Sequence, residues 1–268
     1  MKKSISVLFS AIALSLAILT MSCSRNESPI ADDTQEWVQL NMAIDSLTEV
    51  YTSSMSYKPA ADTINNEKED QTTLHVAEAD ARGALDGAVD GYSIGGAVGA
   101  IVGAIVEGAL QSFQTWMDET SEEIVIDHLG GDITSLGTQY DGAQVGWYHN
   151  VILQQLLQQA SVQPFSSDSE LVAEIVSLCE EQSLPMANNI KTYYLSLAFM
   201  NSTVPSDNVS RTCQNYIRQA YTVPRLQMHQ YTTDYLNEVA STITNSYDRL
   251  RLTCYASVAY YSRMFWHY

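Results

Sequence analysis

Basic residues are scarce in this sequence. Lys and Arg number 13 against 31 Asp and Glu, so the formal net charge is −18. Nucleic-acid binding requires a basic surface, and adhesion to an anionic surface is opposed by repulsion between like charges. We therefore expect no nucleic-acid partner. The acidic balance suits solubility in an extracytoplasmic compartment but identifies no binding partner.

Motifs for catalysis and metal binding are also missing. The sequence has no HExxH, Cys-x-x-Cys, G-x-S-x-G or P-loop pattern. These spacings arrange zinc ligands, a nucleophilic serine or a phosphate-binding loop. Asp127 and His128 lie beside two glutamates and could support acid–base chemistry, but such groups are common in an acidic chain and are usually solvated. We expect a protein that is not an enzyme and has no cofactor or metal.

Strand-like alternation of apolar and polar residues is absent as well. Apolar residues instead recur every three or four positions, which is typical of helices with one buried face. Pro185, Pro205 and Pro224 stand at or just before helix starts, where proline costs no hydrogen bond. The sequence predicts an all-α, bundle-like domain of seven or eight helices over residues 34–268. The expected helices cover about 33–54, 71–119, 139–160, 168–183, 185–200, 207–221, 224–243 and 246–265.

The N-terminus has the parts of a secretory signal. Two lysines precede an apolar run from Ile5 to Leu19, which is too short for the roughly 20 residues of a permanent span. The segment Leu19-Thr20-Met21-Ser22-Cys23 resembles a bacterial lipobox, although that family usually has Leu where Thr20 stands. The resemblance implies a signal peptide over 1–22, a lipid such as palmitate on Cys23, and a flexible tether over 23–33. A plain secretory signal is the alternative.

The lipobox resemblance also implies a location. Acyl chains on Cys23 would anchor the protein stably to a membrane. Ser24 is not Asp, which by resemblance to lipoprotein sorting favours the outer membrane over the inner membrane. The side of the membrane on which the protein faces stays open.

The remaining cysteines are odd in number. If Cys23 is lipidated, Cys179, Cys213 and Cys254 remain, and three thiols cannot all pair within one chain. All three lie in expected helices, where we interpret them as small buried apolar residues. One disulfide with one free thiol is the alternative.

Tyrosines gather near the C-terminus. Tyr255, Tyr260 and Tyr261 stand in the last expected helix, with Trp266 and Tyr268 after them. Aromatic surfaces bind sugars and peptides, but tyrosine at helical spacing more often packs with its hydroxyl near water. We expect packing here.

The most specific pattern is a glycine repeat with a period of four in the long Gly/Ala-rich helix. Residues four apart lie along one ridge of a helix, and a ridge of glycines lets another backbone approach closely. Each helical glycine costs about 0.5–1 kcal/mol relative to alanine, so we expect close packing of a second helix to offset the cost. The glycines are Gly83, Gly87, Gly91, Gly95, Gly99 and Gly103.

Three interpretations of this glycine helix compete. The favoured one is a core helix of a soluble bundle with a partner helix in its groove. The second is a membrane span, but the uncharged residues 91–106 would reach only about 24 Å of the roughly 30 Å hydrocarbon core. The third is conditional insertion into a membrane, because the stretch is similar in pattern to glycine-zipper toxins and two-peptide bacteriocins.

One aromatic cluster is a candidate binding site. Trp147, His149 and Asn150 lie close together in the segment GWYHN, and such residues on one helix can bind a ligand. Burial of the His and Asn inside the bundle is the more common outcome. Together with ADARGALDGAVDG, this segment resembles parts of small lipoproteins of gut Bacteroidota, a resemblance that implies no activity.

The function expected from these features is non-enzymatic. We expect a lipid-anchored envelope protein that acts in binding or assembly, with a protein partner or a second copy approaching the glycine groove. The alternative is a membrane-active protein, pore-forming or bacteriocin-like, that uses the glycine helix over 83–108.

Overall fold

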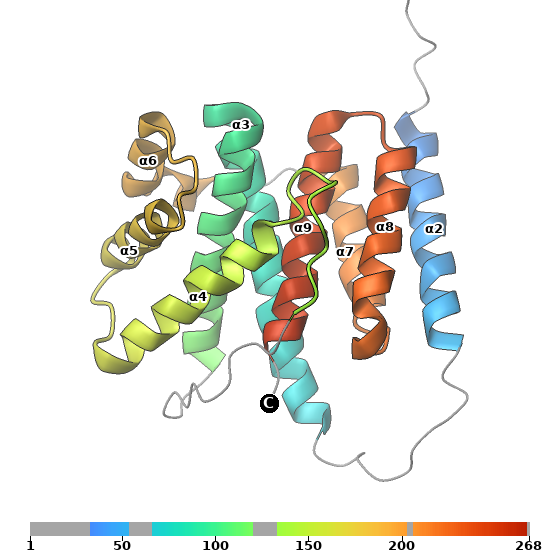
Figure 1. The fold of residues 1–268 in the computed structure, drawn as a ribbon, viewed down its shortest axis with the longest axis horizontal. Coiled ribbons are helices and arrows are strands. Elements are labelled where there is room, and N and C mark those ends of the chain that lie inside the picture. The colour runs from blue at the N-terminus through green and yellow to red at the C-terminus, as the bar shows by residue number, and fades with distance from the viewer. Residues whose placement is uncertain (1–32, 54–65, 120–132, 203–205, 267–268) are drawn as a thin grey trace, which may run out of the picture. The chain divides into compact units, whose positions relative to one another are not determined.

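The computed structural model describes residues 33–53, 66–119, 133–202 and 206–266, and these contain eight α-helices and no strand (Figure 1). The all-α class predicted from the sequence is confirmed. From Trp37 onward the helices belong to one compact unit, Trp37–Tyr268. The helices are α2 (Asp33–Ser53), α3 (Asn66–Glu119), α4 (Val145–Val162), α5 (Asp168–Glu181), α6 (Asn188–Leu195), α7 (Asn208–Ala220), α8 (Met228–Thr242) and α9 (Ser246–Phe265).

Several sequence predictions concern residues outside the described ranges. They are the signal peptide over 1–22, the lipid on Cys23 and the tether up to residue 32. Asp127, His128 and Tyr268 also lie outside the described residues. Each of these stays a prediction.

Side-chain caps explain where helices begin. The Ser167 side chain accepts a hydrogen bond from the first turn of α5, and Asn245 does the same for α9. At the start of α7, an Asp207 carboxylate oxygen accepts from the Ser210 N–H at 2.9 Å. Such a cap contributes about 1 kcal/mol to helix stability.

Several helix boundaries differ from the sequence prediction, and residues with positive φ explain two of them. The helix expected from 139 begins at Val145, because Gly142 adopts φ 90° in the preceding turn. The helix expected over 185–200 ends at Leu195, since Leu197 adopts the left-handed conformation with φ 58°. A short 3₁₀ turn, Ala198–Asn201, follows it.

α9 is the central helix of the compact unit. It contacts α3, α4, α7 and α8, and Figure 1 shows it between α4 and α8. Every residue from Leu250 to Ser262 is buried, so the single apolar stripe expected from the sequence understates its burial. Tyr255, Tyr260 and Tyr261 are packed inside, as predicted. A helix enclosed on all sides must satisfy its polar groups internally.

The buried polar groups of α9 meet partners on neighbouring elements. The Ser257 hydroxyl donates to the Ala143 carbonyl at 2.8 Å and accepts from the Gly146 N–H at 2.9 Å. The Arg251 guanidinium, 3% exposed, donates to Asp207 at 2.7 Å. Asp207 therefore caps α7 and also ties α7 to α9.

The three cysteines of the compact unit are buried free thiols. Cys179, Cys213 and Cys254 each form no disulfide in the described part of the chain. Burial raises the pKa of the Cys179 and Cys254 thiols to about 12. These side chains are packed as small apolar residues, as the sequence predicts.

The long Gly/Ala-rich helix α3 bends back on itself at Gly95 and Gly96, a bend that the sequence pattern does not indicate. Gly96 adopts φ 59° and ψ −145°, a conformation that is essentially restricted to glycine. The Asn189 side chain of α6 donates to the Ile94 carbonyl at 2.8 Å. This contact satisfies one of the carbonyls released where the helix is interrupted. We call the parts of α3 before and after the bend its two limbs.

The glycine repeat lies between the two limbs. A methyl group on Gly87 would overlap the carbonyl oxygen of Gly103, and one on Gly91 would overlap that of Gly99. Gly83 faces the carbonyl oxygen of Glu107 in the same way. The second backbone that the glycine ridge accommodates is therefore the other limb of the same helix. Gly95 differs from the other five, since it lies at the bend and faces the Ile190 side chain.

A carboxyl group is buried beside the glycine contacts. Glu107 is 5% exposed, and its Oε1 has no hydrogen-bond partner among the described residues. Burial, together with the negative charges of Asp90 and Asp86, raises the pKa of Glu107 to about 9. The buried Tyr194 hydroxyl from α6 faces the Glu107 carboxyl, and this contact opposes only part of the rise in the pKa of Glu107. Glu107 is therefore protonated in the folded protein at neutral pH.

By length and composition α3 could cross a membrane. It is the only such helix in the described residues, and 61% of its most apolar window is buried inside the protein. A buried core helix passes the same test.

Candidate functional site

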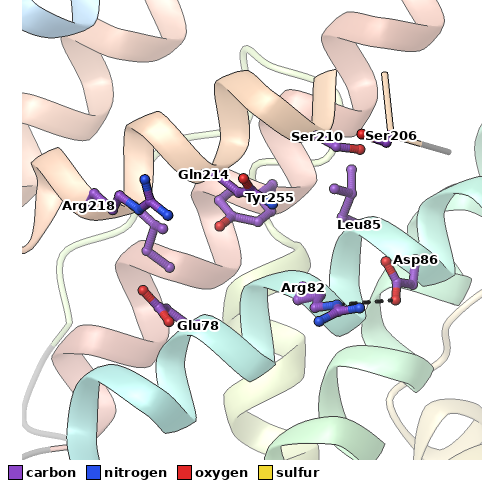
Figure 2. Close-up of a pocket in the computed structure, with 10 residues that line it drawn as sticks. Glu78, Arg82, Leu85, Asp86, Ser206, Ser210, Gln214, Arg218 and Tyr255 are labelled. Carbon is purple, nitrogen blue, oxygen red and sulfur yellow. Dashed lines mark ion pairs between the residues drawn. The ribbon is translucent and has the colours of Figure 1, made fainter. Parts of the chain in front are cut away.

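A cleft opens between α3 and α7, with α9 beneath it. Its volume is about 410 Å³, within the roughly 300–1,000 Å³ of small-ligand sites. Glu78 and Arg82 line it from the first limb of α3, and Gln214 and Arg218 line it from α7 (Figure 2). Tyr255 of α9 lies between these two walls. We call this the α3–α7 cleft.

Helical spacing places these side chains on the cleft walls. Glu78 and Arg82 are four residues apart on α3, and so are Gln214 and Arg218 on α7, so each pair shares one helix face. The Asp207 contact with Arg251 holds the start of α7 against α9. The two walls therefore stand on helices that are fixed to the same central helix.

The floor of the cleft is apolar except for one hydroxyl. Leu85 and Ile217 are buried there, at 4% and 3% exposure. Tyr255 is also only 4% exposed, but its hydroxyl oxygen is not among the enclosed, unpartnered polar atoms of the described residues and keeps contact with solvent. Burial, with the nearby Cys213 and Glu78, raises the pKa of Tyr255 well above its usual value of 10.0. The hydroxyl therefore stays protonated and can donate to a bound molecule.

The rim of the cleft carries charges of both signs. Arg82 Nε lies 4.0 Å from an Asp86 carboxylate oxygen within α3. Burial raises the pKa of Asp86 to about 6 despite the opposing effect of Arg82. Glu78 and Arg218 stand on opposite walls, and neither has an ion-pair or hydrogen-bond partner within the described ranges. In the cleft, Arg82 and Asp86 therefore form an ion pair, whereas Glu78 and Arg218 do not.

A second cleft of about 390 Å³ lies between α8 and α9. Its Arg249 donates to the carbonyl oxygens of Ile243 and Thr244 at 2.9 and 3.3 Å, and its Thr253 hydroxyl donates to the Arg249 carbonyl at 2.8 Å. These polar groups are already satisfied within the protein. The α3–α7 cleft is therefore the stronger candidate for a ligand site.

The residues proposed from GWYHN do not form one site. Trp147 is 42% exposed, whereas His149 is fully buried. The Asn150 amide donates to the Tyr261 carbonyl at 2.9 Å. The side chains therefore lie on different faces of α4, and His149 and Asn150 serve packing inside the protein.

His149 belongs to a buried polar cluster. Its Nε2 lies 3.4 Å from an Asp80 carboxylate oxygen, which also accepts from Trp266 Nε1 at 3.0 Å. The Ser262 hydroxyl donates to the same oxygen. All four side chains are buried, so the cluster joins α3, α4 and the C-terminal end of α9 and is closed to a substrate.

The cleft residues Glu78, Arg82 and Arg218 were not identified from the sequence. Charged residues at four-residue spacing on a helix usually form a solvated face, so they carry no separate signal. Tyr255 was identified only as a packing residue. The one signal in the sequence is the scarcity of basic residues, because a chain with few of them has few places where an anionic group can bind.

No group of three or more His, Cys, Asp or Glu in the described residues is arranged to hold a metal ion. Comparison of the chain with protein families, curated proteins and solved structures gave no match.

Proposed function

We propose that this protein is anchored by a lipid on Cys23 at the bacterial cell envelope, with the outer membrane favoured, and binds a small ligand without chemical change in the α3–α7 cleft. The observation that supports binding is the α3–α7 cleft itself, which Glu78 and Arg218 line from opposite walls without an ion-pair partner within the described ranges. The lipobox-like segment supports the anchor.

The anchor is tested by replacing Cys23 with serine. We expect Cys23→Ser to abolish labelling with radioactive palmitate and to shift the protein from the membrane fraction to the soluble fraction, because the acyl chains supply the membrane affinity. Ser24→Ala is the matched control and should keep both the label and the membrane association. A Cys23→Ser protein that is still labelled would contradict the anchor.

Ligand binding is tested with a cell extract that has been filtered to keep only small molecules. The filtrate is expected to raise the melting temperature of the unlipidated mature protein, since a ligand that binds only the folded state stabilises it. Gln214→Trp, which fills the cleft from α7, should remove the shift. Arg211→Trp is the control, because Arg211 is exposed on the same helix but does not line the cleft.

Two results of this experiment would contradict a ligand site in the cleft. One is a filtrate that leaves the melting temperature unchanged. The other is an equal shift in wild type and Gln214→Trp. Circular dichroism of each variant verifies that the helices are intact.

The membrane-active alternative has no comparable support. The glycine faces that it would use contact each other across the bend of α3. The same contacts leave no open glycine groove, in the described part of α3, for a partner or a second copy.

A further inference from the structure

The Glu78 and Arg218 side chains of the α3–α7 cleft indicate the chemical class of ligand that would fit there. Glu78 projects from α3 and Arg218 from α7, on opposite walls, and Figure 2 shows Tyr255 between the two walls. Arg82 is engaged with Asp86 on the α3 side. Glu78 and Arg218 therefore remain to meet charged groups of a bound molecule.

We propose that the ligand of the α3–α7 cleft is a small zwitterion, a free amino acid or a short peptide. Its carboxylate would accept hydrogen bonds from Arg218, and its ammonium group would donate to Glu78. This inference rests on the proposed ligand-binding function and names the chemical class of the ligand.

Charge balance favours a zwitterion over a simple ion. The four charged side chains of the cleft comprise two arginines and two carboxylates, Glu78 and Asp86. A bare anion would gain from Arg218 but would lie near both carboxylates. A bare cation would gain from Glu78 but would lie near both arginines. A molecule with both charges satisfies Glu78 and Arg218 together, and charge-assisted hydrogen bonds are about twice as strong as neutral ones.

The floor suits the remainder of such a molecule. Leu85 and Ile217 offer an apolar surface for an aliphatic side chain, and burying each CH₂ there would contribute about 0.8 kcal/mol. The Tyr255 side chain lies between the two walls, and its hydroxyl can donate to the carboxylate or to a peptide carbonyl.

The test compares leucine and leucyl-leucine with two compounds that lack one charge. 4-Methylpentanoate is leucine without its ammonium group, and 3-methylbutylamine is leucine without its carboxylate. Titration calorimetry on the unlipidated mature protein should detect binding of leucine or leucyl-leucine. Each singly charged compound should bind at least about tenfold more weakly, because one charged group of the cleft is left without a partner.

Variants locate the interaction. Glu78→Gln and Arg218→Gln should each weaken zwitterion binding by about tenfold or more, and Tyr255→Phe by a smaller factor of about five. Glu49→Gln on the exposed side of α2 and Arg211→Gln on α7 make the same charge changes outside the cleft. Both controls should bind as the wild type does.

Three outcomes would overturn the zwitterion. They are equal binding of 4-methylpentanoate, equal weakening by the two controls, and absence of binding by leucine and leucyl-leucine up to about 10 mM. If these compounds fail while the filtered extract still raises the melting temperature of wild type but not of Gln214→Trp, only the ligand class is wrong. If both experiments fail, the ligand site itself is wrong.

Discussion

Gly87→Ala is expected to lower the free energy of unfolding by about 3 kcal/mol, at the upper end of the usual cost of overpacking. The added methyl would overlap the Gly103 carbonyl oxygen, which belongs to a helix backbone and cannot rotate away. The limbs of α3 must therefore separate, and contacts along the whole pair weaken. Alanine gains about 1 kcal/mol of helix propensity over glycine, which offsets only part of this cost. Urea denaturation followed by circular dichroism measures the change.

Gly95→Ala is the matched control for this clash. Its methyl would meet only the end of the Ile190 side chain, at 2.8 Å from Cδ1, and that side chain can move. We expect a change within about 1 kcal/mol. Equal stability of Gly87→Ala and Gly95→Ala would show that the close approach of the limbs does not limit stability.

Glu107→Gln is expected to stabilise the protein at pH 7 by about 3 kcal/mol. Burial raises the pKa of Glu107 from 4.5 to about 9, so the folded state holds a proton that the unfolded state releases in this range. Stability therefore falls as pH rises from 4.5 to 9, by about 1.4 kcal/mol per pH unit, and levels off above 9. Glutamine has the shape of the protonated acid and cannot ionise, so the variant lacks this loss.

The prediction is checked by urea denaturation at several pH values between 5 and 9. The slope of stability against pH should be smaller in Glu107→Gln than in the wild type. Asp86, with a pKa raised to about 6, adds a fall between pH 4 and 6 that both proteins share. Asp90 and the Tyr194 hydroxyl also lie near Glu107 and are unchanged in the variant. Glu49→Gln removes one negative charge at an exposed site, so it is the control for the change in net charge. Identical slopes in wild type and Glu107→Gln would contradict a buried, protonated Glu107.

The helices could be predicted from the sequence because their signals are local. Asp207 caps α7 within three residues of its partner, and proline spacing marks the starts of the later helices. The bend at Gly95 and Gly96 could not be predicted in this way. Gly95 continues the regular glycine pattern and Gly96 follows it directly, but the bend depends on which surface meets the ridge, a property of tertiary packing.

The candidate site was less accessible to prediction than the fold. Glu78 and Arg218 face each other only because α3 and α7 both pack on α9, so their relationship depends on contacts between elements distant in sequence. Trp147 and His149 show the opposite error. They are close in sequence, but a helix turns by about 100° per residue. Trp147 therefore lies at the surface and His149 lies in the core.

The bend in α3 also constrains how the length of this segment can change. Gly87 faces Gly103 and Gly91 faces Gly99 because each pair is equally distant from Gly95. Deleting one residue from a single limb would rotate the side chains beyond it by about 100° and bring larger residues against the opposite carbonyls. The two limbs can therefore shorten or lengthen only together, in matched steps of four residues. The glycine period therefore fixes the length of one limb relative to that of the other.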